Sequence, residues 1–114
     1  MYYKDLTPYD YGFTNYKNAL NIGWLERGYE FQVGDFPEKQ EVIEKLKLKK
    51  RENLYRGAHS CEFCDRYERE SGNGEYIVMW NKKVYSAPTL IIHYIEIHNY
   101  KPPQEFIDAV INEK

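Results

Sequence analysis

The sequence predicts an α+β domain in which a small antiparallel sheet packs with about three helices and carries a zinc-finger-like metal site. Three observations support this prediction. A hairpin pattern lies near residues 75–86, helical patterns lie near residues 37–51, 88–99 and 103–112, and every cysteine and histidine falls into one of two short clusters. The 114 residues suit one domain, and no repeat, low-complexity stretch or linker divides them. We therefore expect a single domain over residues 1–114.

The N-terminal third of the chain lacks a clean periodic pattern. Residues 1–17, "MYYKDLTPYDYGFTNYK", are rich in tyrosine and in turn-forming residues, so we expect an irregular arm laid over the core by its aromatic rings. Residues 18–33, "NALNIGWLERGYEFQV", predict one or two short strands that turn at "ERG". Most of the regular structure is therefore expected after residue 33.

The next segment predicts the first helix, from about Pro37 to Arg51. Asp35 is followed three residues later by Glu38, which is the spacing of a capping box, and a proline in the first helical turn sacrifices no hydrogen bond. Acidic residues come early and lysines late, as the helix dipole favours. Apolar residues at helical spacing predict the buried face, which contains Val42, Ile43 and Leu46.

The C-terminal half predicts a hairpin followed by two helices. Strands are expected over Tyr76–Trp80 and Lys83–Ser86, with a polar turn at Asn81–Lys82 between them. A helix that is apolar over most of its surface begins at Pro88, and such a helix is expected to be buried. Pro102–Pro103 ends this helix and starts the last one.

Two cysteines and two histidines have the spacing of a Cys2His2 zinc site. Cys61 and Cys64 form a C-x2-C turn, and His93 and His98 have four residues between them on the predicted helix. Five residues rotate a helix by about 140°, so the helix must loosen near His98 for both rings to reach one ion. The 28 residues between Cys64 and His93 exceed the spacing of a nucleic-acid-reading finger. The pattern therefore predicts a structural Zn2+ site within a larger domain.

The ligand set has one open alternative, His59. This residue lies two positions before Cys61, so it could replace His93 or His98 as a ligand or support the site from outside the coordination sphere. The cysteines could also be buried thiols and the histidines ordinary core residues, although their clustering argues against this. A thioredoxin-like dithiol is disfavoured because "SCEFCDRYERESGNG" lacks the strand-and-helix context of that motif.

The histidine cluster does not match the known catalytic zinc motifs. "HYIEIH" places Glu96 outside the H-E-x-x-H arrangement of zinc proteases, and the order and spacing of the cysteines differ from those of zinc deaminases. With four protein ligands, no coordination position is left for water, so we predict no catalytic residue. A metal-dependent hydrolase, in which one histidine is a base and water binds the metal, stays as an alternative.

The overall charge gives little indication of a nucleic-acid partner. The net charge is −2, and the one basic stretch, "KLKLKKRENLYR", is most simply the solvated face and C-terminal end of a helix. Weak nucleic-acid binding through this stretch is the remaining alternative, and a protein partner is favoured over it. The sequence shows neither a signal peptide nor an apolar run long enough to span a membrane, so a cytoplasmic location is expected.

Several motifs together resemble an uncharacterised family of small bacterial single-domain proteins. The resemblance is carried by "GAHSCEFC", "GNGEYIV" and "YSAPTLIIHYIEIHNYKPPQEFIDAV", and also by the upstream "IGWLERGYEFQVGDFPEKQEVIEKL". It implies that the family pattern includes the five cysteine and histidine positions of the predicted site. It implies no reaction, substrate or partner, so we expect a small zinc-stabilised interaction module rather than an enzyme.

Overall fold

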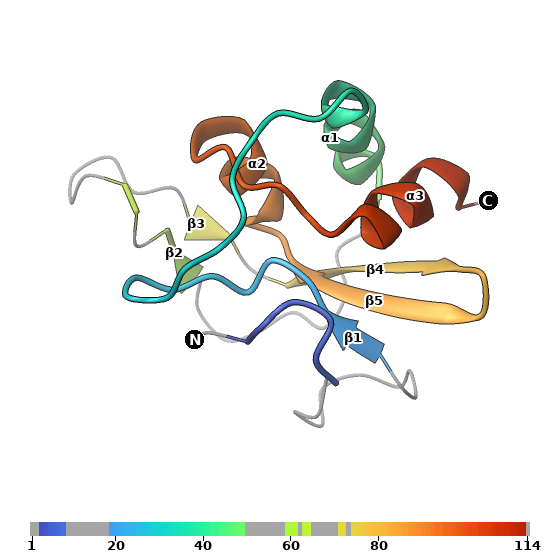
Figure 1. Cartoon of the computed structure of the whole chain (residues 1–114), viewed down its shortest axis with the longest axis horizontal. Coiled ribbons are helices and arrows are strands. Elements are labelled where there is room, and N and C mark those ends of the chain that lie inside the picture. Colours follow the sequence, from blue (N-terminus) through green and yellow to red (C-terminus); the bar gives the residue numbers. More distant parts are fainter. Residues whose placement is uncertain are drawn as a thin grey trace.

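The structure, a computed structural model, describes residues 3–8, 19–49, 59–61, 63–64, 71–72 and 74–113. Figure 1 shows three helices on one side of a small sheet, which confirms the α+β class. The helices are α1 (Lys39–Lys47), α2 (Ile91–Ile97) and α3 (Gln104–Asn112). None of the helices in the described part of the chain is long and apolar enough to cross a membrane.

The three-stranded sheet is mixed rather than purely antiparallel. Its order is β1-β5-β4, and its strands are β1 (Ala19–Asn21), β4 (Glu75–Trp80) and β5 (Lys83–Pro88). The antiparallel β4–β5 pair confirms the predicted hairpin, whereas β1 pairs parallel to β5. Both turn residues, Asn81 and Lys82, have positive φ angles, of 54° and 64°, as the tight turns of two-residue hairpins require.

Strand β5 extends two residues further than predicted and ends at Pro88, which was expected to begin the helix that follows. Pro88 pairs with Glu75 in the register of the hairpin, and it lies beyond Ser86, the last residue of β5 that pairs with β1. Its missing amide hydrogen therefore leaves no sheet hydrogen bond unmade. Helix α2 begins only at Ile91, so the predicted start at residue 88 was wrong.

Helix α1 also begins later than predicted, and the expected capping box does not form. Glu38 is the N-cap residue, but no side chain caps the helix. The Asp35 carboxylate instead pairs with the Lys39 ammonium group at 3.2 Å, which removes it from the helix amides. The predicted C-terminal end at Arg51 lies outside the described residues, whereas α3 begins at Gln104, close to the prediction.

A second, two-stranded sheet was not predicted. Strand β2 (His59–Ser60) pairs antiparallel with β3 (Ser71–Gly72). Strands of two residues are too short to give an alternating pattern, so sequence periodicity could not reveal them. This small sheet positions the chain directly before Cys61.

The N-terminal segment lies beside the first strand in the part that the structure describes. Tyr3 bridges to Trp24 and Pro8 to Leu20, while residues 9–17 of the predicted arm lie outside the described residues. Residues 18–33 contribute one strand, β1, and a turn at Gly28, where φ is 97°. The predicted turn at "ERG" is thus confirmed, and only one of the two possible strands forms here.

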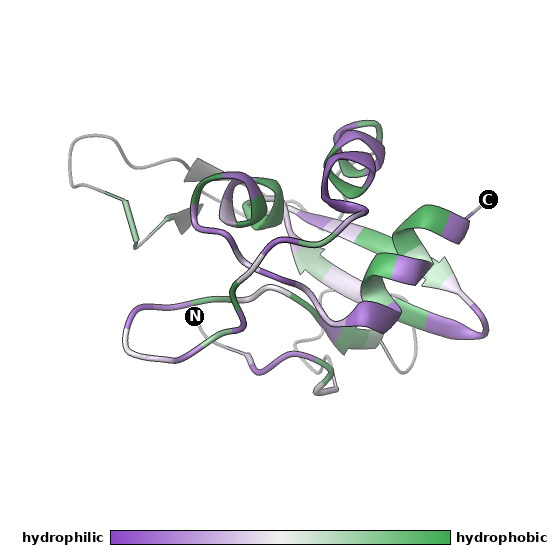
Figure 2. Cartoon of the chain, turned by 45° about the horizontal axis from the view of Figure 1, so that its top comes forward, coloured by the Kyte–Doolittle hydropathy of each residue, from purple (hydrophilic) through white to green (hydrophobic). Residues whose placement is uncertain are grey.

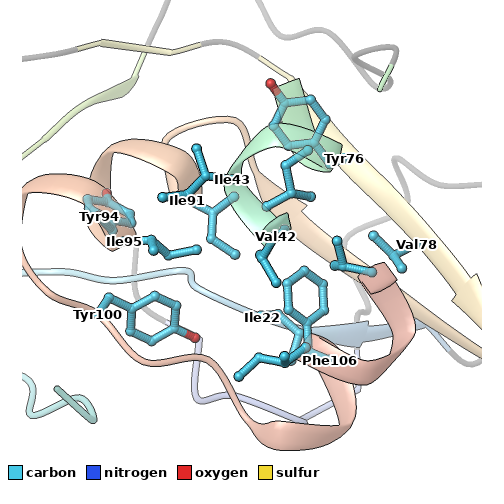
Figure 3. Packing of buried hydrophobic residues seen from close by; sticks show 14 of the residues in the cluster. Ile22, Val42, Ile43, Tyr76, Val78, Ile91, Tyr94, Ile95, Tyr100 and Phe106 are labelled. Carbon is cyan, nitrogen blue, oxygen red and sulfur yellow. The ribbon is translucent and has the colours of Figure 1, made fainter. Parts of the chain in front are cut away.

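The core fills the space between the helices and the sheet. Figure 3 shows side chains from α1, α2 and α3 meeting those of the sheet, and Figure 2 shows hydrophobic and hydrophilic residues alternating along α1 and α3, as amphipathic helices require. The predicted apolar face of α1 is confirmed, because Val42, Ile43 and Leu46 are buried. The core holds α2 against the sheet and so fixes the position of its two histidines.

Candidate metal centre

The two cysteines are placed by a short turn and the two histidines by the end of a helix. Cys61 directly follows β2 and Cys64 lies in the turn after it, while His93 lies within α2 and His98 is the C-cap residue of that helix. The structure brings all four side chains together, with their ligand atoms within 4.8 Å of one another. Such a group could hold a metal ion.

The end of α2 loosens at His98, as the sequence requires. The helix ends at Ile97, and Asn99 adopts a left-handed conformation with φ of 58°. The Tyr94 carbonyl accepts hydrogen bonds from the amides of both His98 and Tyr100, at 3.1 and 3.0 Å. His98 therefore lies at the point where the regular helix ends, and the centroids of the His93 and His98 rings are 5.0 Å apart.

The distances between sulfur and nitrogen fit one tetrahedral ion. Cys61 Sγ is 3.2 Å from His98 Nε2, and Cys64 Sγ is 3.1 Å from His93 Nε2 and 3.4 Å from His98 Nε2. Zinc bonds of about 2.3 Å to sulfur and about 2.0–2.1 Å to nitrogen give sulfur–nitrogen separations of about 3.5 Å at tetrahedral angles. These three distances are therefore close to the sulfur–nitrogen separations of a tetrahedral site, and all four ligand atoms lie within 4.8 Å of one another.

Burial affects the protonation of this group in two ways. Burial raises the pKa of the Cys61 thiol, and the neighbouring Cys64 adds to this effect. Burial also lowers the pKa of His98, and the nearby His93 contributes in the same direction. Neutral imidazoles are the form that binds a metal, and a divalent cation would supply the positive charge that two thiolates need, one of them buried and the other half-buried.

An aromatic cluster surrounds the centre on one side, and the sequence did not predict it. Phe63 lies between the two cysteines, and its ring contacts those of His98, Tyr94 and Phe31 at centroid distances of 5.6, 5.9 and 5.2 Å. The position of an apolar residue inside the C-x2-C turn was the one available signal. These rings connect the cysteine turn to residues outside the centre.

His59 and Glu96, which the sequence analysis also considered, are not among the four clustered residues. His59 lies in β2, where its backbone pairs with Gly72, but its side chain lies outside what the structure describes. Its role as an alternative ligand therefore stays a prediction. Glu96, which no zinc motif includes, forms an ion pair with Lys47 at 3.8 Å on the surface.

The basic stretch that begins in the last turn of α1 is partly neutralised within the chain. Lys45 pairs with Glu41 at 3.6 Å, Lys47 pairs with Glu96, and Lys49 pairs with Glu113. The other predicted cations of this stretch, which are Lys50, Arg51 and Arg56, lie outside the described residues. Lys45 and Lys47 therefore resemble the solvated helix face that the sequence predicts, whereas Lys49 is mostly buried.

Together, these features define a small α+β protein with a Cys2His2 group that could hold a metal ion. The chain belongs to the family described as "Domain of unknown function (DUF7919)", whose model matches residues 1–111. This membership confirms the predicted resemblance to an uncharacterised family. Comparison with curated proteins and with solved structures gives no match. The family assigns no activity, so a function has to be argued from the site.

Proposed function

We propose that the protein is a zinc-stabilised protein-interaction module without catalytic activity. The observation that carries this proposal is the convergence of four ligand atoms, from Cys61, Cys64, His93 and His98, within 4.8 Å. Cys61 and Cys64 come from the turn after β2, while His93 comes from α2 and His98 from its C-cap, so one ion would join segments that are far apart in the sequence. The metal would then act as a crosslink of the fold.

The donor set favours zinc over other divalent metals. Two thiolates and two imidazoles in a tetrahedral arrangement are a common structural zinc set, whereas magnesium and calcium prefer oxygen ligands. Both cysteines are free thiols rather than a disulfide, which suits a reducing compartment and supports the cytoplasmic location that we propose.

Four protein donors favour a structural role for this ion over a catalytic one. A catalytic zinc site keeps one position open for water or substrate, whereas a structural site is filled by protein ligands. The Cys61 side chain is fully buried, and the ring of Phe63 covers the site next to His98. A stable surface built around such a centre is suited to binding another protein.

The decisive experiment combines metal analysis with a thiol titration of the purified, untagged protein. We expect about one zinc per chain, and both thiols should resist modification until a chelator removes the metal. Freely reactive thiols without bound metal would refute the proposal. A zinc with three protein ligands and an exchangeable water, detected by X-ray absorption spectroscopy, would instead support the metal-dependent hydrolase.

A further inference from the structure

A cleft on the side of the N-terminal segment is separate from the four ligand residues. It lies between residues 3–8 and the segment that follows β1, and its volume is about 320 Å³. This volume is at the lower end of the range of small-ligand sites, and it is large enough for one long side chain. Its lining residues are Lys4, Asp5, Leu25, Glu30, Phe31 and Gln32.

Asp5 is the most firmly held polar group of this cleft. Its Oδ1 accepts a hydrogen bond from the Gly23 amide at 2.9 Å, and its Oδ2 accepts one from the Tyr100 hydroxyl at 2.6 Å. Each carboxylate oxygen can accept a second hydrogen bond, so both retain a lone pair for a ligand. Burial raises the pKa of Asp5, which means that this carboxylate is incompletely stabilised as an anion.

The charges of the cleft favour a cationic occupant. Asp5 and Glu30 carry two negative charges and Lys4 carries one positive charge, so the lining has a net charge of −1. None of the ion pairs between described residues involves any of these three groups. A cation that enters the cleft would therefore gain the attraction of two carboxylates without displacing an ion pair of the described structure.

The apolar side of the cleft is connected to the metal centre. The Phe31 ring lines the cleft, and its ring contacts those of Phe63 and Tyr100 at centroid distances of 5.2 and 6.0 Å. Phe63 belongs to the cysteine turn, and Tyr100 is the residue that holds Asp5. The metal centre thus supports the aromatic wall of the cleft through Phe63.

We infer that this cleft is a docking site for an arginine side chain of a protein partner. A guanidinium group is planar, carries several N–H donors and is weakly hydrated, so it can stack on Phe31 and donate to the Asp5 carboxylate together. Glu30 provides a second negative charge at the same cleft. The inference rests on the proposed interaction function and gives that function a specific binding chemistry.

The test is a titration of the purified full chain, as it is isolated, with the peptide acetyl-Gly-Arg-Gly-amide, followed by amide NMR. We expect saturable shifts at Gly23 and Phe31. The matched peptide with citrulline in place of arginine, which keeps the shape but lacks the charge, should bind at least fivefold more weakly. Equal binding of the two peptides, or no shifts with either, would overturn the inference. Tighter binding of free arginine than of the peptide would identify a small-molecule site and would also overturn it.

Charge-removing variants show whether the peptide binds at the cleft or elsewhere on the surface. Glu30→Gln should raise the peptide Kd about threefold and Asp5→Asn about tenfold, whereas Glu41→Gln on α1 removes the same charge elsewhere and should leave the Kd unchanged. Wild-type affinity in both cleft variants would contradict the inference. If circular dichroism shows that Asp5→Asn fails to fold, the variants Glu30→Gln and Phe31→Leu test the inference instead. Glu30 and Phe31 both line the cleft, and in the described structure neither forms a hydrogen bond to another segment.

Metal content measured on the same samples distinguishes the two proposals. Charge-dependent peptide binding by a protein that contains no zinc would refute the metal proposal and support the cleft. One zinc per chain without charge-dependent peptide binding would refute only the arginine site.

Discussion

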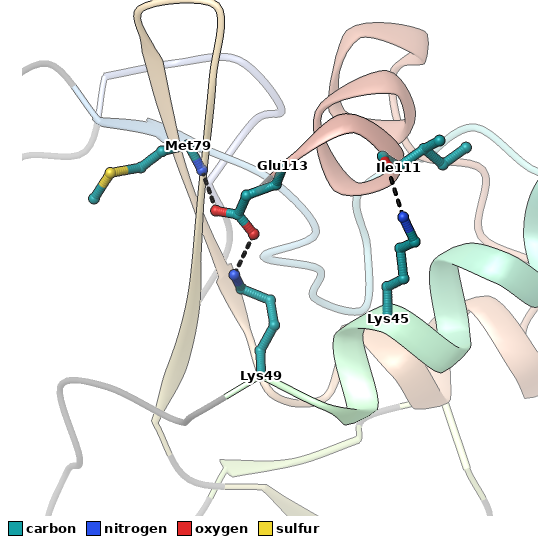
Figure 4. Close-up of polar contacts among 5 residues, drawn as sticks. All are labelled: Lys45, Lys49, Met79, Ile111 and Glu113. Atoms are coloured by element: carbon teal, nitrogen blue, oxygen red, sulfur yellow. Dashed lines mark hydrogen bonds and ion pairs between the residues drawn. The ribbon is translucent and has the colours of Figure 1, made fainter.

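The candidate metal centre and the C-terminal clasp both bring together segments that are far apart in the sequence, but they do so with different chemistry. We use the name clasp for the contacts among Lys45, Lys49, Met79, Ile111 and Glu113. Figure 4 shows the Glu113 carboxylate accepting hydrogen bonds from the Met79 amide and from the Lys49 ammonium group, while Lys45 donates to the Ile111 carbonyl. The metal centre uses soft donors of which one, Cys61, is fully buried, whereas the clasp uses charged side chains near water.

The comparison indicates which of the two should dominate stability. A metal ion binds the unfolded chain more weakly than the folded one, because only Cys61 and Cys64 stay close together there, so much of its binding energy contributes to folding. A charged pair near the surface is already well solvated in the unfolded chain, and only a small difference remains. The clasp also satisfies a backbone donor at a sheet edge, because Glu113 accepts a hydrogen bond from the Met79 amide of β4, one of the two edge strands of the three-stranded sheet.

The largest effect is expected from loss of a metal ligand. His93→Gln should lower the free energy of unfolding by about 3 kcal/mol or more, because it removes one of four donors to a crosslinking ion. Thermal or urea unfolding in zinc-containing buffer measures this change. Glu96→Gln on the same helix is the matched control and should cost no more than about 0.5 kcal/mol.

Chelation provides an independent check of that prediction. Wild-type protein treated with a chelator should unfold at nearly the same denaturant concentration as His93→Gln, because both lack the metal crosslink. A His93→Gln variant as stable as the wild type would show that the metal centre contributes no more to the free energy of unfolding than the clasp does.

An intermediate effect is expected where the chain after α2 holds the N-terminal segment. Tyr100→Phe removes the hydrogen bond to the Asp5 carboxylate and should lower the free energy of unfolding by about 1–2 kcal/mol, since Tyr100 is buried and the acceptor is charged. Urea unfolding measures the loss. A free energy of unfolding equal to that of the wild type would show that the hydroxyl of Tyr100 has no particular role.

A smaller effect is expected at the clasp itself. A double-mutant cycle with Lys49→Met and Glu113→Gln should give a coupling energy of about 0.5–1 kcal/mol, because the two side chains are mostly but not fully buried. Chemical unfolding of the two single variants and the double variant gives this value. A coupling above the loss seen for His93→Gln would reverse the order of the two regions.

The smallest effect is expected in acid, at the hydrogen bond between the buried Tyr85 of β5 and the half-buried Glu105 of α3. The Tyr85 hydroxyl lowers the pKa of Glu105 by donating a hydrogen bond to it, and Lys83 acts in the same direction. Because the folded-state pKa lies below the unfolded value of 4.5, this carboxylate stabilises the fold fully above that pH. The contribution is lost as the pH falls through the folded pKa.

The acid limb of the stability curve checks this prediction. Tyr85→Phe should reduce the difference in unfolding free energy between pH 6 and pH 3, two values chosen to lie about 1.5 units on either side of the unfolded pKa. An unchanged pH dependence in the variant would show that the hydrogen bond does not set the pKa of Glu105.

Much of the candidate site could be predicted from the sequence because its signal is local. The C-x2-C spacing places two sulfurs in one turn, and the spacing of His93 and His98 on a helix limits where their rings can go. The loosening of α2 at His98 was also predictable, since a separation of five residues exceeds one helical turn by about 140° and leaves the two histidines on different sides of a regular helix. The helix boundaries were less predictable. Asp35 forms an ion pair with Lys39 instead of capping the helix amides, and Pro88 belongs to strand β5 instead of the helix.

The sequence by itself determined the α+β class, the hairpin, the apolar face of α1 and the identity of the four clustered residues. These features depend on the spacing of residues along one segment, where local geometry limits the outcome. The tertiary structure alone decided that β1 pairs parallel to β5, that Phe63 connects the centre to Phe31, and that Tyr100 holds Asp5. Tyr100 and Asp5 are 95 positions apart in sequence, and which distant segments meet depends on the packing of the whole core rather than on any local pattern.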